Sequence, residues 1–206
     1  TPTRQWQPNL YGRPPSNKPL KFPGIAGSLR RNPFTRAALV AAQGLLPVGV
    51  ELEIFDLEGI PLFNQDLEAT PVARLIEFKK MIRAADAIVF ATPEYNYSVP
   101  GVLKNAIDSA SRPYGQSAWT GKPVAVMGAS MALFGSARAQ YHLRQTFVAL
   151  NMYQLNQPEV MIGHAGDVDA AFDADGKLID AGSQNLIRQL LENLASWTRQ
   201  LKTQLA

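Results

Sequence analysis

Residues 87–101 read AIVFATPEYNYSVPG, and this stretch decides the fold. Its first five residues, Ala87 to Ala91, are apolar without alternation, as is typical of a parallel strand buried on both faces. The connector from Pro93 to Val99 is rich in aromatic and amide side chains. Pro100 then introduces a helical apolar pattern, because proline fits the first turn of a helix. The stretch therefore predicts a buried strand, a loop and a helix in succession.

The same alternation of short apolar runs and helical patterns continues on both sides of this stretch. Further candidate strands lie at Phe22 to Ala26, Val50 to Asp56, Pro123 to Gly128 and, more weakly, Met152 to Asn156. Helical faces are formed by Phe34, Ala38, Ala41 and Leu45; by Val72, Leu75, Ile76 and Ile82; by Val102, Leu103, Ala106, Ile107 and Ala110; by Leu143, Phe147 and Leu150; and by Ile187, Leu190, Leu191, Leu194, Leu201 and Leu205. Because parallel strands are joined by helical crossovers, this order predicts an α/β fold, a three-layer sandwich whose five-stranded parallel sheet carries helices on both faces.

The first of these strands contains a proline. Pro23 and Gly24 stand where a central strand is expected to run, and proline has no N–H to donate to an interior ladder. We therefore expect a short first strand that begins around Gly24 or Ile25.

Residues 1–20 differ in composition from the rest of the chain. They hold five prolines and no periodicity, which predicts an extended N-terminal arm before one domain at residues 21–206. Two interpretations of the arm stay open, a flexible terminus and an arm that lies across a partner subunit. The arm has no continuous apolar core like that of a secretory signal, and no apolar run approaches the roughly 20 residues of a membrane span. We therefore expect a cytoplasmic protein with no membrane partner.

Composition excludes several kinds of chemistry. The 206 residues include no Cys, so disulfides, thiol nucleophiles, thiolate metal sites and iron–sulfur clusters are excluded. Seven Lys and Arg residues precede Glu51 with no acid among them, whereas the remaining 13 bases face all 17 acids. This distribution favours a locally positive site or tail, and we expect no nucleic-acid partner.

An acidic stretch runs from Asp167 to Asp175 and continues into Gly176. It lacks the Asp-x-Asp-x-Asp spacing and the twelfth-position Glu of a calcium loop. It therefore predicts a solvated hairpin turn, and we expect no metal site.

Three loops directly follow predicted strands, at Gly27 to Thr35, Pro93 to Val99 and Ala129 to Ser136. In open parallel sheets, ligands bind beyond the carboxyl ends of the strands, near the point where the strand order reverses. These three loops are therefore the candidates for a binding site.

The first loop has the groups that a phosphate monoester needs. It offers a small residue, two hydroxyls and a guanidinium before a helix whose first amides are free, namely at Gly27, Ser28, Thr35 and Arg30. We expect Asn32 to cap that helix, with Pro33 as its first residue. An ordinary capped turn with arginines facing solvent is the alternative. The chain has no GxxxxGK[ST] and no GxGxxG, so a nucleoside triphosphate or dinucleotide fingerprint is absent.

The second loop suits a flat heterocycle. Its backbone can line one edge of a ring system, and Tyr95 or Tyr97 can cover a face. A packed loop with one incidental acid is the alternative. Glu94 has no His or second carboxylate near it in sequence, so no acid/base dyad is predicted.

These residues resemble those of the NAD(P)H-dependent FMN reductase family, which has a flavodoxin-like fold. The branch most resembled contains the soluble quinone and chromate reductases, and the likeness covers roughly residues 24–200. The matching motifs are Gly27-Ser28-Leu29-Arg30, Pro93 to Gly101, Val102-Leu103-Lys104-Asn105-Ala106-Ile107-Asp108, Gly121-Lys122-Pro123, Ala137 to Gln145 and Gln157-Pro158-Glu159.

The resemblance implies that FMN binds noncovalently to this chain. Ser28, Arg30, Phe34 and Thr35 would then hold its phosphate. Its ring would lie along Pro93, Glu94, Tyr95 and Asn96, and Ser130 and Gly135 would close the other side.

The chain departs from the family pattern in two places. The family usually has Ser, an aromatic residue and Asn where this chain has Pro33, Phe34 and Thr35, so a hydroxyl is lost at 33 and an amide at 35. These losses are expected to weaken FMN binding unless backbone amides and Arg30 compensate. The third loop is also bulkier from Ser130 to Ser136 than the family's Gly-rich version, which leaves the size of the acceptor pocket open.

The resemblance further implies an enzyme that passes electrons from NADPH or NADH to small electrophilic acceptors such as quinones, with chromate, azo dyes and free flavin as further candidates. The flavin carries this chemistry, so no catalytic side chain is required. We accordingly expect structural roles for His142 and His164. An electron carrier that serves a protein partner is one alternative, and a flavodoxin-like protein that has lost its flavin is another.

The predicted fourth helix carries more apolar surface than one sheet face needs. In the family, this region helps to form dimers that complete the flavin pocket. We therefore expect a homo-oligomer, a dimer or a tetramer, with Arg138, Tyr141 and Glu159 as interface candidates. Trp6 and Trp119 are expected to serve packing or an interface.

Overall fold

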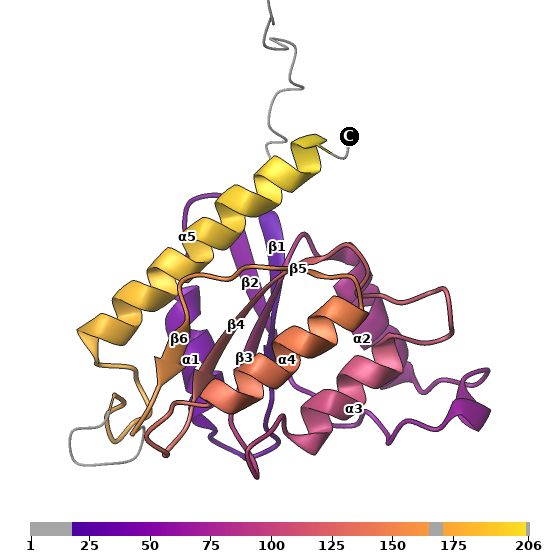
Figure 1. Ribbon diagram of the computed structural model, residues 1–206, viewed down its shortest axis with the longest axis horizontal. Helices are drawn as coiled ribbons and strands as arrows, with labels where there is room; N and C mark the ends of the chain where they lie inside the picture. Colours follow the sequence, from indigo (N-terminus) through magenta and orange to yellow (C-terminus); the bar gives the residue numbers. More distant parts are fainter. Residues whose placement is uncertain (1–17, 165–170, 205–206) are drawn as a thin grey trace, which may run out of the picture.

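A parallel sheet between two layers of helices forms the protein (Figure 1). The computed structural model describes residues 18–164 and 171–204. Within them, the strands are β1 (Leu20–Ala26), β2 (Val50–Phe55), β3 (Ile88–Thr92), β4 (Pro123–Ala129), β5 (Tyr153–Gln154) and β6 (Val160–Ile162). The helices are α1 (Phe34–Gln43), α2 (Ala73–Ala84), α3 (Gly101–Ala110), α4 (Ala137–Ala149) and α5 (Ala181–Gln204), with a short 3₁₀ helix at Gln65–Leu67.

The strand order confirms the predicted α/β sandwich. The strands run β2-β1-β3-β4-β5, every pair is parallel, and β6 also pairs with β4. This is the 2-1-3-4-5 order of flavodoxin-like sheets, in which the order reverses between β1 and β3. The fifth position is divided, because β5 pairs with the start of β4 and β6 with its end. The weak strand predicted at Met152 to Asn156 is the two-residue β5, and β6 was not predicted.

Each face of the sheet has its own core. Helices α1 and α5 cover one face, and α2, α3 and α4 cover the other (Figure 1). Every residue of β3 and of β4 is buried, as the apolar runs predict for inner strands. Trp119 is fully buried between the rings of Phe78 and Phe90, and its indole N–H donates to the carbonyl of Ile107 at 2.9 Å. The packing role expected for Trp119 is confirmed, whereas Trp6 lies outside the described residues.

The prediction of a short first strand is wrong. Strand β1 begins at Leu20 and pairs with β2 along its length, including at Pro23. The pairing of β1 with β3 begins only at Gly24. The N–H of Leu20 donates toward β2, at the carbonyl of Gly49, so by strand alternation the nitrogen of Pro23 faces the other way. The N–H that Pro23 lacks would therefore face β3 just before the β1–β3 pairing begins, so its absence interrupts neither pairing.

Two helix predictions also need correction. Helix α1 begins at Phe34, and Pro33, not Asn32, stands at its N-cap position with no side-chain cap. Helix α2 buries Phe78 and Ile82, whereas the predicted face residue Ile76 is 52% exposed. The core face of α2 is set by its contact with Phe55 and Trp119, which the apolar spacing alone does not reveal.

The acidic stretch forms a turn where it is described. The carboxylate of Asp173 accepts hydrogen bonds from the N–H groups of Asp175 and Lys177, and Phe172 and Leu178 pair across the turn. This agrees with the predicted hairpin turn, although residues 167–170 lie outside the described residues. Among residues 18–164 and 171–204, we find no helix with the length and apolar content that a membrane span needs.

The first turn of α5 yields a testable prediction about pH. The carboxylate of Asp180 accepts a hydrogen bond from the N–H of Ser183 at 2.6 Å, and hydrogen bonds from the Ser183 hydroxyl and N–H lower the pKa of this carboxyl. Stabilisation by Asp180 is therefore present above the ordinary pKa of 3.8 and is lost as the pH falls through the lowered folded value. We expect Asp180→Ala to reduce the free energy of unfolding by about 1 kcal/mol at neutral pH, and by progressively less in acid.

Urea unfolding, followed by circular dichroism across that pH range, measures this difference. Asp175→Ala is the control, because only the backbone N–H of Asp175 takes part in the turn. A difference that stayed constant down to the acid limit would contradict the capping role.

Candidate functional site

The three loops selected from the sequence meet at one edge of the sheet. They follow β1, β3 and β4, which are neighbours in the sheet, and the carboxyl ends of these strands point to the lower edge of Figure 1. The register aligns Ala26 with Ala91 and Ala91 with Met127, so the loops leave the sheet side by side. At this edge, the N–H of Gly27 donates to the carbonyl of Ala91 at 2.8 Å.

The first loop leaves hydrogen-bond donors without partners. Helix α1 has no side-chain cap, so the N–H groups of Phe34 and Thr35 have no acceptor among the described residues. Thr35 is 1% exposed, and its hydroxyl oxygen is buried with no hydrogen-bond partner. An unpaired buried hydroxyl costs free energy, so this position suits a ligand that supplies an acceptor.

Positive charge stands beside these donors. Arg30 and Arg31 are exposed, whereas Arg36 pairs with Asp56 at 3.3 Å. The hydroxyl of Ser28 accepts a hydrogen bond from the N–H of Arg30 at 3.2 Å. The loop thus combines hydroxyls, amides, a helix N-terminus and a guanidinium, which together suit an anion with several oxygens.

The second loop contains a tight turn. Tyr95 and Ser98 exchange both backbone hydrogen bonds, at 3.1 and 3.0 Å. The two residues between them, Asn96 and Tyr97, have φ values of 50° and 67°. Positive φ at both central residues is the geometry of a type I′ turn, which favours Asn and Gly and is costly for a tyrosine. The turn therefore fixes the loop in a backbone conformation that the surroundings must support.

One hydrogen bond joins the first two loops. The hydroxyls of Ser28 and Tyr95 lie 3.0 Å apart. The predicted phosphate residue and the predicted ring residue are thus in direct contact. The two halves of the predicted site form one surface.

The side chain of Glu94 is buried against the start of α4. Its side chain is 5% exposed, and its carboxylate accepts hydrogen bonds from the N–H groups of Arg138 and Ala139 at 3.0 and 3.3 Å. It also pairs with the guanidinium of Arg138, and this hydrogen bonding raises the pKa of Arg138. The carboxylate therefore caps the N-terminus of α4.

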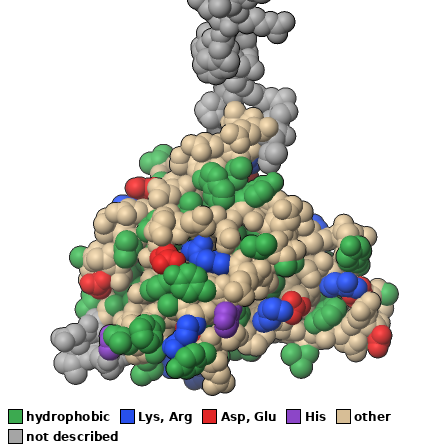
Figure 2. All heavy atoms as spheres, viewed as in Figure 1, with side chains coloured by type: hydrophobic (Ala, Val, Ile, Leu, Met, Phe, Trp, Pro, Cys, Tyr) green, Lys and Arg blue, Asp and Glu red, His purple; other side chains and the backbone are tan. Residues whose placement is uncertain are grey.

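The third loop closes against the edge strand. Gly135 has a φ of 51°, and a Cβ atom there would lie 2.6 Å from the carbonyl carbon of Met161. The hydroxyl of Ser130 accepts a hydrogen bond from the N–H of Ala132 at 3.2 Å. The bulky side chains of this loop point outward, since Met131, Leu133 and Phe134 are 57–65% exposed. Figure 2 shows hydrophobic and positive side chains gathered there, over the loops and the start of α4.

Two residues of α4 take part that the sequence did not assign to the site. The guanidinium of Arg138, expected only at an interface, lies 3.6 Å from the ring centroid of Tyr97 and 5.2 Å from that of Phe134. The Nδ1 atom of His142 lies 2.9 Å from the hydroxyl oxygen of Ser98. No local pattern predicts the contacts with Tyr97 and Ser98, because each spans about 40 residues of chain.

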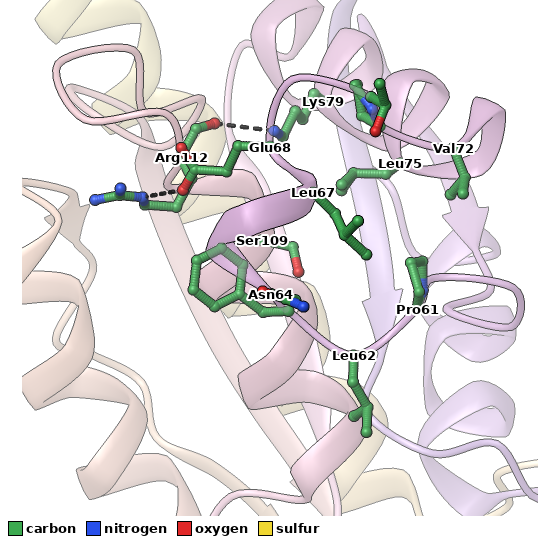
Figure 3. A pocket seen from close by; sticks show the side chains of 13 residues that line it. Pro61, Leu62, Asn64, Leu67, Glu68, Val72, Leu75, Lys79, Ser109 and Arg112 are labelled. Carbon is green, nitrogen blue, oxygen red and sulfur yellow. Dashed lines mark hydrogen bonds and ion pairs between the residues drawn. The ribbon is translucent and has the colours of Figure 1, made fainter.

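A separate pocket lies away from the three loops (Figure 3). It is enclosed by residues 61–72 and by side chains of α2 and α3, and Ser109 lies among its lining. At its wall, the ammonium of Lys79 donates to the carbonyl of Arg112, whose guanidinium pairs with Glu68. Burial lowers the pKa of Lys79. None of the residues predicted to hold a phosphate or a ring lines this pocket.

Comparison with known proteins points to one family. The sequence model for NADPH-dependent FMN reductases matches residues 20–167. An NAD(P)H-dependent FMN reductase of Pseudomonas aeruginosa is 53% identical over 184 residues, which cover 89% of this chain and 97% of that protein. A 2-hydroxy-1,4-benzoquinone reductase of Burkholderia sp. is 40% identical over 182 residues, or 87% of this chain and 97% of that protein.

A solved structure agrees with these relatives. FerB of Paracoccus denitrificans, a flavoenzyme NAD(P)H:(acceptor) oxidoreductase, superposes with a TM-score of 0.79 and 31% sequence identity, covering 88% of this chain and 98% of that one. This similarity confirms the flavodoxin-like fold expected from the sequence.

The capping role of Glu94 can be tested. We expect Glu94→Gln to lower the melting temperature by several degrees, because it removes the buried charge that holds the first amides of α4 and the guanidinium of Arg138. Thermal unfolding followed by circular dichroism measures the change. The matched control is Glu77→Gln, which breaks an exposed pair with Arg74 and should have little effect. Equal melting temperatures for the two variants would contradict the assignment.

Proposed function

The chain belongs to the NADPH-dependent FMN reductase family, and from this premise we propose that it is an FMN-dependent oxidoreductase that uses NADPH or NADH to reduce small electrophilic acceptors, quinones first. The observation that carries the proposal is the buried, unpartnered hydroxyl of Thr35 at the uncapped start of α1. It is a donor prepared for an anionic group, at the end of the sheet where flavodoxin-like folds bind their ligands.

Four residues of the first loop and α1 would hold the FMN phosphate. Ser28 and Thr35 would donate through their hydroxyls, Phe34 through its backbone N–H, and Arg30 through its guanidinium. The ring of Phe34 packs 5.2 Å from that of Phe172, which leaves its backbone as the contacting group. The hydroxyl of Thr35 thus stands in for the amide that the family usually has there, and it offsets part of the loss at Pro33.

The second and third loops would hold the isoalloxazine ring. Pro93, Tyr95 and Asn96 would line one side together with the backbone of Glu94, and Ser130 and Gly135 would close the other. The left-handed turn at Asn96 and Tyr97 and the tight contact at Gly135 fix these segments before any ligand arrives. Such prior order reduces the entropy cost of binding.

When bound, FMN supplies the redox chemistry, taking a hydride from the nicotinamide nucleotide and passing electrons to the acceptor. The protein positions the two reactants in turn and shields the ring from water. The exposed rings of Tyr97 and Phe134, with Arg138 between them, form an apolar and positive border on which a flat acceptor can stack. Cytoplasmic location is proposed with this activity, because NADPH and NADH are abundant in the cytoplasm.

The acceptor class is proposed from the names of the relatives and from the border formed by Tyr97, Phe134 and Arg138. The match to this chain covers 92–97% of the length of the relatives named as quinone reductases. Quinones are therefore the acceptor class proposed first. Chromate, azo dyes and free flavin are proposed as secondary acceptors.

Steady-state oxidation of NADPH and NADH with a benzoquinone tests the function. We expect yellow purified protein, or a colourless protein that takes up added FMN, and turnover without any protein partner. An electron carrier would take up FMN but show negligible turnover. Failure of the purified protein to take up FMN would refute the proposal.

We also propose self-association through α4. Tyr141 and Val148 on this helix are 49% and 69% exposed, and the hydroxyl of Tyr141 donates to Glu159 at 3.3 Å. This hydrogen bond raises the pKa of Tyr141. Together with Arg138, these groups form a surface suited to a dimer or tetramer. Size-exclusion chromatography with light scattering tests it, and a monomer at all concentrations would refute it.

Replacing Thr35 by Val is expected to have opposite effects on the protein without and with FMN. The protein without FMN should gain about 1 kcal/mol in free energy of unfolding, because an unpaired buried hydroxyl is removed. Affinity for FMN should fall by roughly 10-fold or more, because a hydrogen bond to a charged phosphate is lost. Urea unfolding and the quenching of flavin fluorescence measure the two effects.

Thr35→Ser is the matched control, since it keeps the hydroxyl and should keep FMN affinity within about threefold. A Val variant that binds FMN as tightly as the parent protein would refute the phosphate assignment of Thr35.

A further inference from the structure

The turn at Tyr95–Ser98 is held in a conformation that its own residues do not favour. Asn96 and Tyr97 both have positive φ, and neither is glycine. A chain free to relax would return Tyr97 to negative φ, which would move the side chains of both residues. Contacts from outside the turn must therefore maintain it.

Those contacts come mainly from the first two turns of α4. Glu94, just before the turn, accepts hydrogen bonds from the start of this helix, and Arg138 stacks on the ring of Tyr97. The end of the turn is held separately. The hydroxyl of Ser98 is hydrogen-bonded to Nδ1 of His142 at 2.9 Å, one helical turn after Arg138.

In the described part of the chain, the imidazole of His142 has no hydrogen-bond partner besides Ser98. Its side chain is exposed and belongs to neither core, and Ser98 is the partner of its ring. The core face of α4 is formed instead by Leu143 and Phe147. The bond to Ser98 therefore serves the loop and not the packing of the helix.

We propose that His142 is a positioning residue for the flavin reaction, and that its hydrogen bond to Ser98 holds the Tyr95–Ser98 turn so that Asn96 and Tyr97 meet the ring correctly. Ser98 supplies the carbonyl that accepts the N–H of Tyr95, so anchoring its side chain fixes the closing residue of the turn. This inference rests on the proposed function, because the ring is the group that the turn would meet.

A set of variants on α4 and the loop tests the inference. His142→Ala should weaken FMN binding by roughly two- to tenfold, the size expected for one neutral hydrogen bond, and should change the visible flavin spectrum. His142→Asn should restore affinity, because its amide can donate to or accept from Ser98 near the position of Nδ1. Gln145→Ala is the matched control, because this residue of the same helix is exposed and has no hydrogen bond to the loop among the described residues.

A double-mutant cycle isolates the bond itself. If His142 acts through Ser98, the combination of His142→Ala with Ser98→Ala should weaken FMN no more than either change alone. FMN affinity, the flavin spectrum, and kcat and KM for a benzoquinone are measured on each protein. We expect KM to rise more than kcat falls, because the turn would position the reactants.

The outcomes separate this inference from the proposed function. A parent protein that takes up no FMN refutes the function and, with it, this role. A parent protein that binds FMN, together with a His142→Ala variant of unchanged affinity and spectrum, refutes only the positioning role. A lower melting temperature with unchanged flavin properties, or additive effects in the cycle, also refutes it.

Discussion

Parallel pairing of β1, β3 and β4 is the constraint on which the rest of the site depends. Their register brings Ala26, Ala91 and Met127 level, so three loops that are far apart in sequence leave the sheet together. Parallel strands put all their carboxyl ends at one edge, so the loops that follow them share that edge. The apolar runs of β3 and β4 thus build the core and also fix the place where polar groups converge.

Helices α1 and α4 both begin at this edge, but among the described residues only α4 has a side chain that accepts hydrogen bonds from its first N–H groups. At α4, the buried carboxylate of Glu94 satisfies the first N–H groups from within the chain. At α1, proline occupies the cap position, and the hydroxyl of Thr35 stays buried without a partner. The positive end of one helix is therefore neutralised and rigid, and the other is left for an external anion. This difference supports the proposal that the phosphate end of a ligand binds at α1, while α4 supports the second loop.

Local sequence patterns were enough to predict the order of strands and helices and the three loops of the candidate site. Apolar runs and helical spacing located the sheet, its order of elements and the three loops, because burial on both faces leaves a clear periodic signal. Prediction from the sequence failed at Pro23 and Ile76, whose surroundings depend on strands and rings distant in the chain, and at Asn32, which stands one residue before the N-cap of α1. The contact of Glu94 with Arg138 spans 44 residues, and so does that of Ser98 with His142. Carboxylates and histidines carry no local sign of such partners, so their roles needed the folded structure.

The outward direction of the third loop decides what the border of the site can recognise. Met131, Leu133 and Phe134 are bulky, but they are exposed and leave the tight packing to Gly135. Their bulk thus extends the apolar border instead of filling the crevice. A flat apolar acceptor gains roughly 25 cal/mol for each Å² that it buries there, whereas a small inorganic oxyanion gains nothing from that surface. The exposed rings of this border therefore support the proposal of quinones as the first acceptor class.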